Sequence, residues 1–177
     1  MTQPTYKEAL TSANHLLATD VATRFIGYGL KKGRALGTLK GVNDSQIIET
    51  PVAENLMVGM ATGLALKGYK PVVFIERMDF VLNALDALVN HLDKVKRMSR
   101  GEFSPSAIIR CVVGNKDKPL YTGDTHVQDF SNALRHMLSF PVRQLHTPAD
   151  IPSAYAQAKA DLDQGRSTLL VEYKDLV

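Results

Sequence analysis

A strand-helix-strand pattern within residues 47–75 most restricts the folds open to this chain. The segment KPVVFI, Lys70–Ile75, is apolar almost throughout, which is typical of a parallel strand covered on both faces. It follows a predicted helix, Val52–Leu66, and a short apolar patch at Ile47–Ile48 that we interpret as a brief strand. Because a helix that crosses between two such strands makes them parallel neighbours, the pattern predicts an α/β fold.

The remaining segments continue this alternation of strands and helices. Further strands are predicted over Thr23–Leu30, Ala107–Val113, Val142–Leu145 and Thr168–Tyr173. Further helices are predicted over Thr5–Asp20, Phe80–Met98, Val127–Leu138 and Pro148–Leu162. We therefore expect a doubly wound, mostly parallel sheet with helices on both faces, formed by a single domain over residues 1–177.

Charge and segment lengths exclude several partners. The chain has two basic clusters, which are either solvated surface or a rim that faces an anion. The first comprises Lys31, Lys32, Arg34 and Lys40. The second comprises Lys94, Lys96, Arg97 and Arg100. Neither cluster is interleaved with aromatic residues, so we expect no nucleic-acid partner. No signal peptide or membrane span is recognisable, which predicts a cytoplasmic protein without a membrane partner. The single cysteine, Cys111, lies in an apolar run and is expected to be a buried core residue.

The helix predicted over Val52–Leu66 has two unusual properties. Thr50 and Pro51 form a start signal in which threonine caps the helix and proline takes its first position. The helix is apolar nearly all round, so we expect it to be buried on several sides. Gly59 and Gly63 would let another backbone approach closely, and we expect that approach at a subunit interface.

In a doubly wound sheet, ligands bind beyond the carboxyl ends of the strands. The loops expected there are 31–45, 76–79 and 114–126, and the start of the Val52 helix can reach the same edge. None contains a dinucleotide or Walker phosphate-binding motif, zinc-ligand spacing or a nucleophile elbow. The candidate chemical group is therefore Glu54, in the first turn of the helix.

Two interpretations of Glu54 remain open from its position alone. A carboxylate there complements the positive end of the helix dipole, which is worth about 0.3–1 kcal/mol. Alternatively, a carboxyl group desolvated beside an apolar helix holds a raised pKa and shares a proton with a ligand nitrogen.

Several short motifs, taken in their order along the chain, resemble those of a known protein family. They are EAL, GRALGTLKGV, ETPVAEN, GMATGLALKGYKPVV, MDF, KRMS and HVQ, followed by a closing strand. In this order the chain resembles the thiamine-diphosphate pyrimidine-binding domain in the beta subunit of 2-oxo acid dehydrogenases, within the transketolase-like family. Each motif is weak alone, but their order and spacing are specific.

The resemblance implies roles for individual residues. Glu54 matches the glutamate that binds the N1′ nitrogen of the aminopyrimidine, and Phe80 matches the aromatic residue that packs on that ring. His126 matches a histidine near the substrate that assists proton transfer or orients a carboxylate, whereas without this context it would be an ordinary surface histidine. The TP and MDF motifs add Thr50 and Met78 to the predicted cofactor-binding residues.

The family's diphosphate-binding domain is not recognisable in this chain. In the family that domain holds magnesium and the diphosphate through a GDG segment followed by an NN pair, whereas Gly123-Asp124 here has no NN downstream. We therefore expect a separate subunit to supply GDG…NN and the magnesium, in a heterotetramer with a site between chains. The family's C-terminal domain is also expected to be absent, which favours transketolase-like, acyloin-forming or decarboxylase chemistry over transfer to lipoyl groups.

These expectations define a function and its alternatives. The resemblance implies the pyrimidine-binding subunit of a split enzyme that acts on a small 2-oxo acid or ketose donor, by decarboxylation, acyl or two-carbon transfer, or carboligation. One alternative is a non-catalytic paralogue that regulates a partner enzyme. Another is an independent ligand-binding domain of flavodoxin type.

Overall fold

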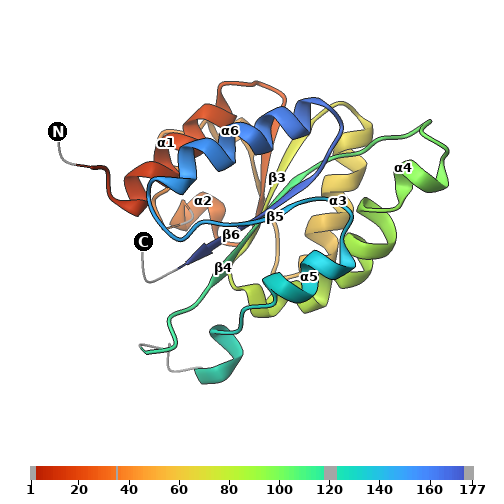
Figure 1. The fold of residues 1–177 in the computed structure, drawn as a ribbon. Helices are drawn as coiled ribbons and strands as arrows, with labels where there is room; N and C mark the ends of the chain where they lie inside the picture. Colours follow the sequence, from red (N-terminus) through yellow and green to blue (C-terminus); the bar gives the residue numbers. More distant parts are fainter. Residues whose placement is uncertain (1–2, 35, 118–122, 174–177) are drawn as a thin grey trace.

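The computed structural model describes residues 3–34, 36–117 and 123–173 (Figure 1). Its six strands form one sheet in the order β2-β1-β3-β4-β6-β5, and every neighbouring pair is parallel. The strands are β1 Thr23–Gly27, β2 Ile47–Glu49, β3 Lys70–Ile75, β4 Ile108–Val113, β5 Val142–Gln144 and β6 Thr168–Tyr173. The predicted parallel α/β sheet is confirmed.

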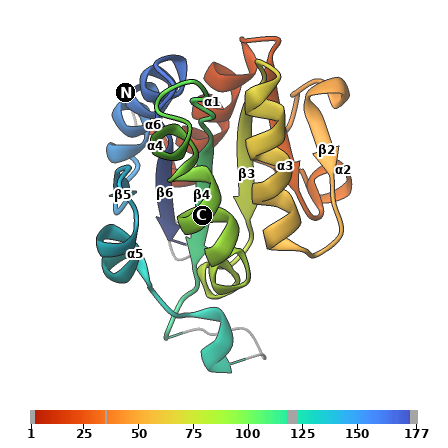
Figure 2. The same ribbon diagram turned by 90° about the vertical axis from the view of Figure 1, so that its right-hand side faces the viewer.

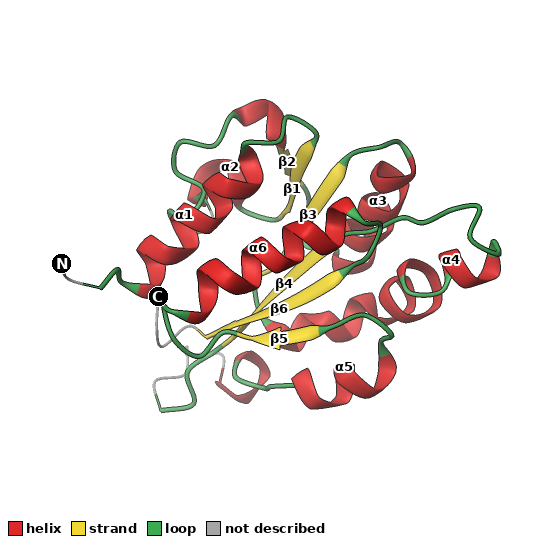
Figure 3. Cartoon of the chain, turned by 45° about the horizontal axis from the view of Figure 1, so that its top comes forward, coloured by secondary structure: helices red, strands yellow, loops and turns green. Residues whose placement is uncertain are grey.

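Helices cover both faces of the sheet (Figures 1 and 2). The α-helices are α1 Tyr6–Ala18, α2 Leu30–Gly33, α3 Glu54–Leu66, α4 Val95–Met98, α5 Ser131–Met137 and α6 Asp150–Asp163. Three 3-10 segments are η1 Asp44–Gln46, η2 Met78–Ala84 and η4 Gly123–His126, and η3 Asp86–Leu92 is a π-helix. Figure 3 shows α1 and α6 together on one face, with α3 and α5 on the other side of the strands.

The core has two parts because consecutive side chains of each strand point to opposite faces. Val72 and Phe74 of β3 pack in a cluster with α1 and α6, whereas Val73 and Ile75 pack in a cluster with α3, η2 and η3. Cys111 lies in the second cluster and is fully buried, and burial raises the pKa of its thiol. It is a core residue, as expected.

The start of α3 differs from the prediction. The helix begins at Glu54 with Ala53 as its N-cap, so Thr50 does not cap it and Pro51 is not its first residue. Instead, the Thr50 N–H donates to the Gly27 carbonyl at 3.0 Å, which keeps Thr50 at the end of the sheet. A following proline also disfavours helical backbone at the residue before it.

The segment predicted as one helix over Phe80–Met98 is three short helices. Its buried residues Met78, Val81 and Ala84 recur every third position, the spacing that places side chains on one face of a 3-10 helix. The backbone then widens into η3, whose end is marked by the Asp93 N–H donating to the Leu88 carbonyl at 3.0 Å. The prediction of a single α-helix is therefore wrong, because this backbone follows the shape of the core rather than one α-helical period.

The glycine-containing segment 31–45 was predicted as a long loop and holds two short helices, α2 and η1. Glu49, at the end of β2, accepts hydrogen bonds from the N–H groups of Gly29 at 2.5 Å and Lys31 at 2.7 Å. These bonds hold the start of α2 at the carboxyl edge of the sheet, beside the ends of β1 and β2.

Candidate functional site

Two polar side chains are buried without partners where β2 leads into α3. Thr50 is 4% exposed, and its hydroxyl has no hydrogen-bond partner. Glu54 is 5% exposed, and no hydrogen bond or ion pair to it occurs in the part of the chain that the structure describes. Since buried polar groups are nearly always paired, this hydroxyl and carboxylate are available to a group from outside the chain.

Phe80 and His126 come together, although they lie far apart in the sequence. Their ring centroids are 5.1 Å apart and the ring planes are at 88°, an edge-to-face contact. Phe80 lies on η2, which packs against α3, and His126 is the last residue of η4. His126 is thus fixed against an aromatic ring rather than free in solvent.

Two hydrogen bonds hold the segment after His126 against η2. Asp79 Oδ1 accepts from the side-chain Nε2 of Gln128 at 2.8 Å, and from its N–H at 3.4 Å. The Phe130 N–H donates to the sulfur of Met78 at 3.0 Å. Because these bonds use the backbone at residues 128 and 130, the predicted helix over Val127–Leu138 starts only at Ser131.

Asp79 and Gln128 are functional candidates that the sequence analysis missed. Asp79 is 7% exposed and its Oδ2 is buried without a partner. The available signal was a carboxylate placed between two large apolar residues, Met78 and Phe80, because a buried carboxylate nearly always has a partner.

Gly114 lets the strand end and the histidine approach each other. An ideal Cβ built on Gly114 would lie 1.9 Å from the carbonyl oxygen of His126. From the sequence, residue 114 is only the first position of the loop expected over 114–126. Its lack of a side chain is what permits this close approach.

A polar network continues along the same edge of the sheet. Asp129 accepts hydrogen bonds from the Ser131 N–H at 2.9 Å and from the Tyr173 hydroxyl at 3.1 Å. Burial raises the pKa of Asp129, but the hydrogen bonds outweigh it, so its pKa is below the usual value. Burial also raises the pKa of Tyr173, to about 12. At neutral pH Asp129 is therefore ionised and Tyr173 is protonated. Their hydrogen bond ties the segment after His126 to β6.

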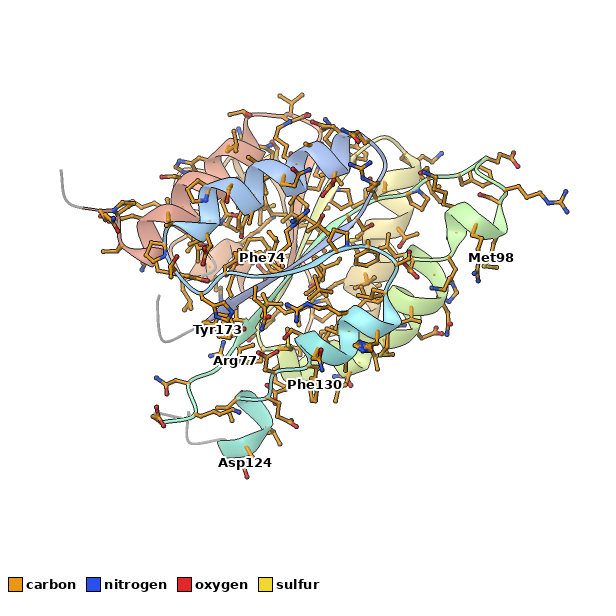
Figure 4. All side chains as sticks on the ribbon, in the orientation of Figure 1. Phe74, Arg77, Met98, Asp124, Phe130 and Tyr173 are labelled. Carbon is orange, nitrogen blue, oxygen red and sulfur yellow. The ribbon has the colours of Figure 1, made fainter. Side chains whose placement is uncertain are left out.

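The predicted site residues are thus placed in two groups. Thr50 lies shortly before α3, and Glu54 is the first residue of that helix. Phe80 of η2 and His126 of η4 make the ring contact, and η2 packs against α3. Met78 is fully buried, and its sulfur accepts the hydrogen bond from the Phe130 N–H. Its contact with the cofactor stays a prediction. Figure 4 shows Phe130 and Arg77 toward the end of the molecule from which Asp124 projects.

No group of three His, Cys, Asp or Glu side chains that could hold a metal ion occurs within 3–34, 36–117 and 123–173. Over the same described ranges, no helix is long and apolar enough to cross a bilayer.

Comparison with protein families gives a match over almost the whole chain. The model described as "Transketolase, pyrimidine binding domain" matches residues 2–177. The mitochondrial pyruvate dehydrogenase E1 component subunit beta of Saccharomyces cerevisiae is 31% identical over 137 residues, which cover 72% of this chain and 36% of that protein. The acetoin:2,6-dichlorophenolindophenol oxidoreductase subunit beta of Cupriavidus necator is 27% identical over 147 residues, covering 81% of this chain and 42% of that protein. The chain thus spans well under half of either relative.

Solved structures share the fold at low sequence identity. A split gene transketolase, described as an inactive beta4 tetramer, has a TM-score of 0.69 at 15% identity over 96% of this chain and 50% of that one. A thiamine diphosphate-dependent 4-hydroxybenzoylformate decarboxylase of Rhodococcus jostii has a TM-score of 0.66 at 17% identity over 98% of this chain and 31% of that one. Together with the family match, these results show that the chain belongs to the pyrimidine-binding domain family of transketolase-like, thiamine-diphosphate-dependent enzymes.

Proposed function

We propose that this chain is the pyrimidine-binding subunit of a split thiamine-diphosphate-dependent enzyme that cleaves or forms a carbon-carbon bond beside the carbonyl of a 2-oxo acid or ketose donor. The observation that carries the proposal is the unpartnered, buried carboxylate of Glu54 at the start of α3, the helix that packs against the η2 segment of Phe80, which in turn contacts His126. The names of the relatives, which include beta subunits of pyruvate and 2-oxoisovalerate dehydrogenases, support a 2-oxo acid donor.

The residues present suit an aminopyrimidine ring. Glu54 has no competing partner in the described chain, so its carboxylate is free to share a proton with the ring nitrogen N1′. Thr50 offers a hydroxyl that needs a partner, and Phe80 offers an aromatic surface for stacking. When bound, the cofactor would supply a nucleophilic carbon and an electron sink for the donor's carbonyl carbon.

The protein's own groups then control protons and solvent. Glu54 would hold and return the proton at N1′ from an almost fully buried position, where few waters compete for it. His126, held edge-to-face by Phe80, would move a proton at the substrate. Asp79 and Gln128 would act as positioning residues, because their hydrogen bonds hold the segment after His126 against η2.

A second chain is part of this proposal. We infer that it carries the GDG…NN segment, binds magnesium and the diphosphate, and assembles with this chain as a heterotetramer. The exposed face of α3 supports an interface, because Leu56 and Leu66 are about half exposed and nothing lies within 4 Å of a Cβ built on Gly59 or Gly63. A small-residue face of this kind suits close helix packing.

The test replaces Glu54 by glutamine. The Glu54→Gln variant is expected to lose at least about a hundredfold in turnover with the partner, magnesium and thiamine diphosphate, since general acid-base groups typically contribute that much. Its unfolding and its partner affinity should be unchanged. Glu102→Gln, at an exposed position, is the matched control and should keep full activity.

Near-normal turnover of Glu54→Gln would contradict the catalytic assignment. Titration of thiamine diphosphate separates the regulatory alternative. A half-site subunit must raise the partner's cofactor affinity strongly, whereas a regulatory subunit would leave that affinity nearly unchanged.

A further inference from the structure

A separate cavity of about 230 Å³ opens at the carboxyl ends of β1, β3 and β4, next to α2. Its wall includes Tyr28, Gly33, Leu36, Phe74, Arg77 and Val112. None of the residues assigned above to the cofactor site lines it.

Arg77 is a buried cation in the wall with unused donors. The residue is 4% exposed, and its Nη1 donates to the adjacent Glu76 carbonyl at 2.7 Å. Its Nε is buried without a partner, and no carboxylate of the described chain pairs with it. A buried guanidinium whose Nε has no acceptor and whose charge has no counter-ion is costly, so this position calls for an anion from outside the chain.

The other charged groups of the cavity do not fill that role. Arg110 also lines it, but it is paired with the buried Glu172 and lies 3.8 Å from the Phe74 ring centroid. Glu76 lines the cavity and is exposed, yet it makes no ion pair with Arg77. Lys31 and Lys32 lie exposed on α2 beside the cavity residues Leu30 and Gly33. These lysines add positive charge at the rim.

The shape and lining define the class of ligand. The remaining wall is mostly apolar and aromatic, from Tyr28, Leu36, Phe74 and Val112. A volume of about 230 Å³ is below the roughly 300–1,000 Å³ of pockets that hold drug-sized ligands, which suits a small ring. We propose that this cavity binds a small carboxylate with a flat apolar body, whose carboxylate is held by the planar fork of Arg77. This inference does not rest on the proposed function.

The test measures binding of benzoate to the full chain by titration calorimetry, with benzamide as its neutral counterpart and inorganic phosphate as an anion without an apolar body. Benzoate is expected to bind at least about tenfold more tightly than either probe. Arg77→Gln should weaken benzoate binding by at least about tenfold, since hydrogen bonds to charged groups are worth that much. Arg77→Lys should recover only part of the loss, because lysine keeps the charge but not the fork.

Two further variants make the result independent of folding defects. Arg97→Gln removes an exposed arginine elsewhere on the chain and should bind benzoate normally. Gly33→Phe adds a bulky side chain to the cavity wall without removing charge and without a clash at its Cβ, and it should weaken benzoate binding. Equal binding of benzoate and benzamide, equal binding of phosphate, undiminished binding by folded Arg77→Gln, or no benzoate binding at millimolar concentration would each overturn the proposal.

Discussion

At the scale of single residues, Gly114 decides where His126 lies. The His126 carbonyl oxygen would be 1.9 Å from a Cβ at position 114, well inside any tolerated contact. We expect Gly114→Ala to shift the His126 backbone, to lower the free energy of unfolding by about 1–3 kcal/mol and to move the imidazole resonances of His126 in NMR spectra. The shift should also lower turnover of the assembled enzyme, because His126 would leave its contact with Phe80.

Gly33→Ala is the control for the NMR measurement, because its Cβ has free space and the His126 resonances should not move. An unchanged His126 resonance and unchanged stability in Gly114→Ala would show that the segment can relax without cost. The importance assigned to the close approach would then be wrong.

At the scale of elements, α3 is less buried than its sequence suggests. Its buried residues are Glu54, Met57, Val58 and Ala61, whereas Val52 just before it and Leu56 and Leu66 within it are 61%, 47% and 49% exposed. The prediction that the helix is buried on several sides is therefore wrong for the isolated chain. The apolar pattern therefore leaves exposed residues on one face of α3, and an interface over that face stays a proposal.

Replacing a glycine of α3 should raise the stability of the chain but weaken its assembly with a partner. Gly59→Ala should raise the stability of the isolated chain by about 0.5–1 kcal/mol, because alanine in a helix loses less entropy than glycine. The same methyl group should weaken assembly, because it separates two closely packed backbones. Urea unfolding of the single chain and sedimentation of the mixture with its partner measure the two effects. Unchanged assembly would place the interface elsewhere.

At the scale of the whole molecule, three tyrosines tie distant segments together. Tyr6 of α1 donates to the Leu145 carbonyl at 2.8 Å, Tyr155 of α6 donates to Glu172 of β6 at 2.7 Å, and the Tyr173 hydroxyl bonds to Asp129. Burial raises the pKa of all three hydroxyls, and the charge of Glu172 raises those of Tyr6 and Tyr155 further. The folded chain therefore favours their protonated forms.

These shifts predict a loss of stability in alkali. Each folded pKa lies above the unfolded value of about 10, so the stabilisation is complete below about pH 10. It is lost as the pH rises through the folded values, that of Tyr173 being about 12. Urea unfolding at a series of pH values from 8 to 11 should show this decline, because the unfolded chain releases its tyrosine protons first.

Tyr6→Phe should lower stability at pH 8 by about 1 kcal/mol through the lost hydrogen bond, yet flatten the decline above pH 10. The exposed Tyr69→Phe is the control and should leave the slope unchanged. A slope unaffected by Tyr6→Phe would show that other groups cause the alkaline loss.

The sequence by itself determined the sheet. The runs Lys70–Ile75 and Thr168–Tyr173 are buried almost throughout, and a strand covered on both faces needs apolar residues at consecutive positions, a requirement readable from neighbours alone. Cys111 could be placed for the same reason. The family resemblance, carried by the order of short motifs, pointed to Glu54, Phe80 and His126.

Only the tertiary structure decided how those residues are held. Thr50 was predicted to cap α3 but bonds to Gly27, and Asp79 was passed over but holds Gln128. Arg77 likewise became a candidate only in the structure, where it lines a cavity at the ends of β3 and β4 beside α2 and its Nε has no hydrogen-bond partner. The physical reason is that periodicity reports which face of an element is apolar, whereas hydrogen bonds and cavities depend on which distant segments the parallel sheet brings to one edge.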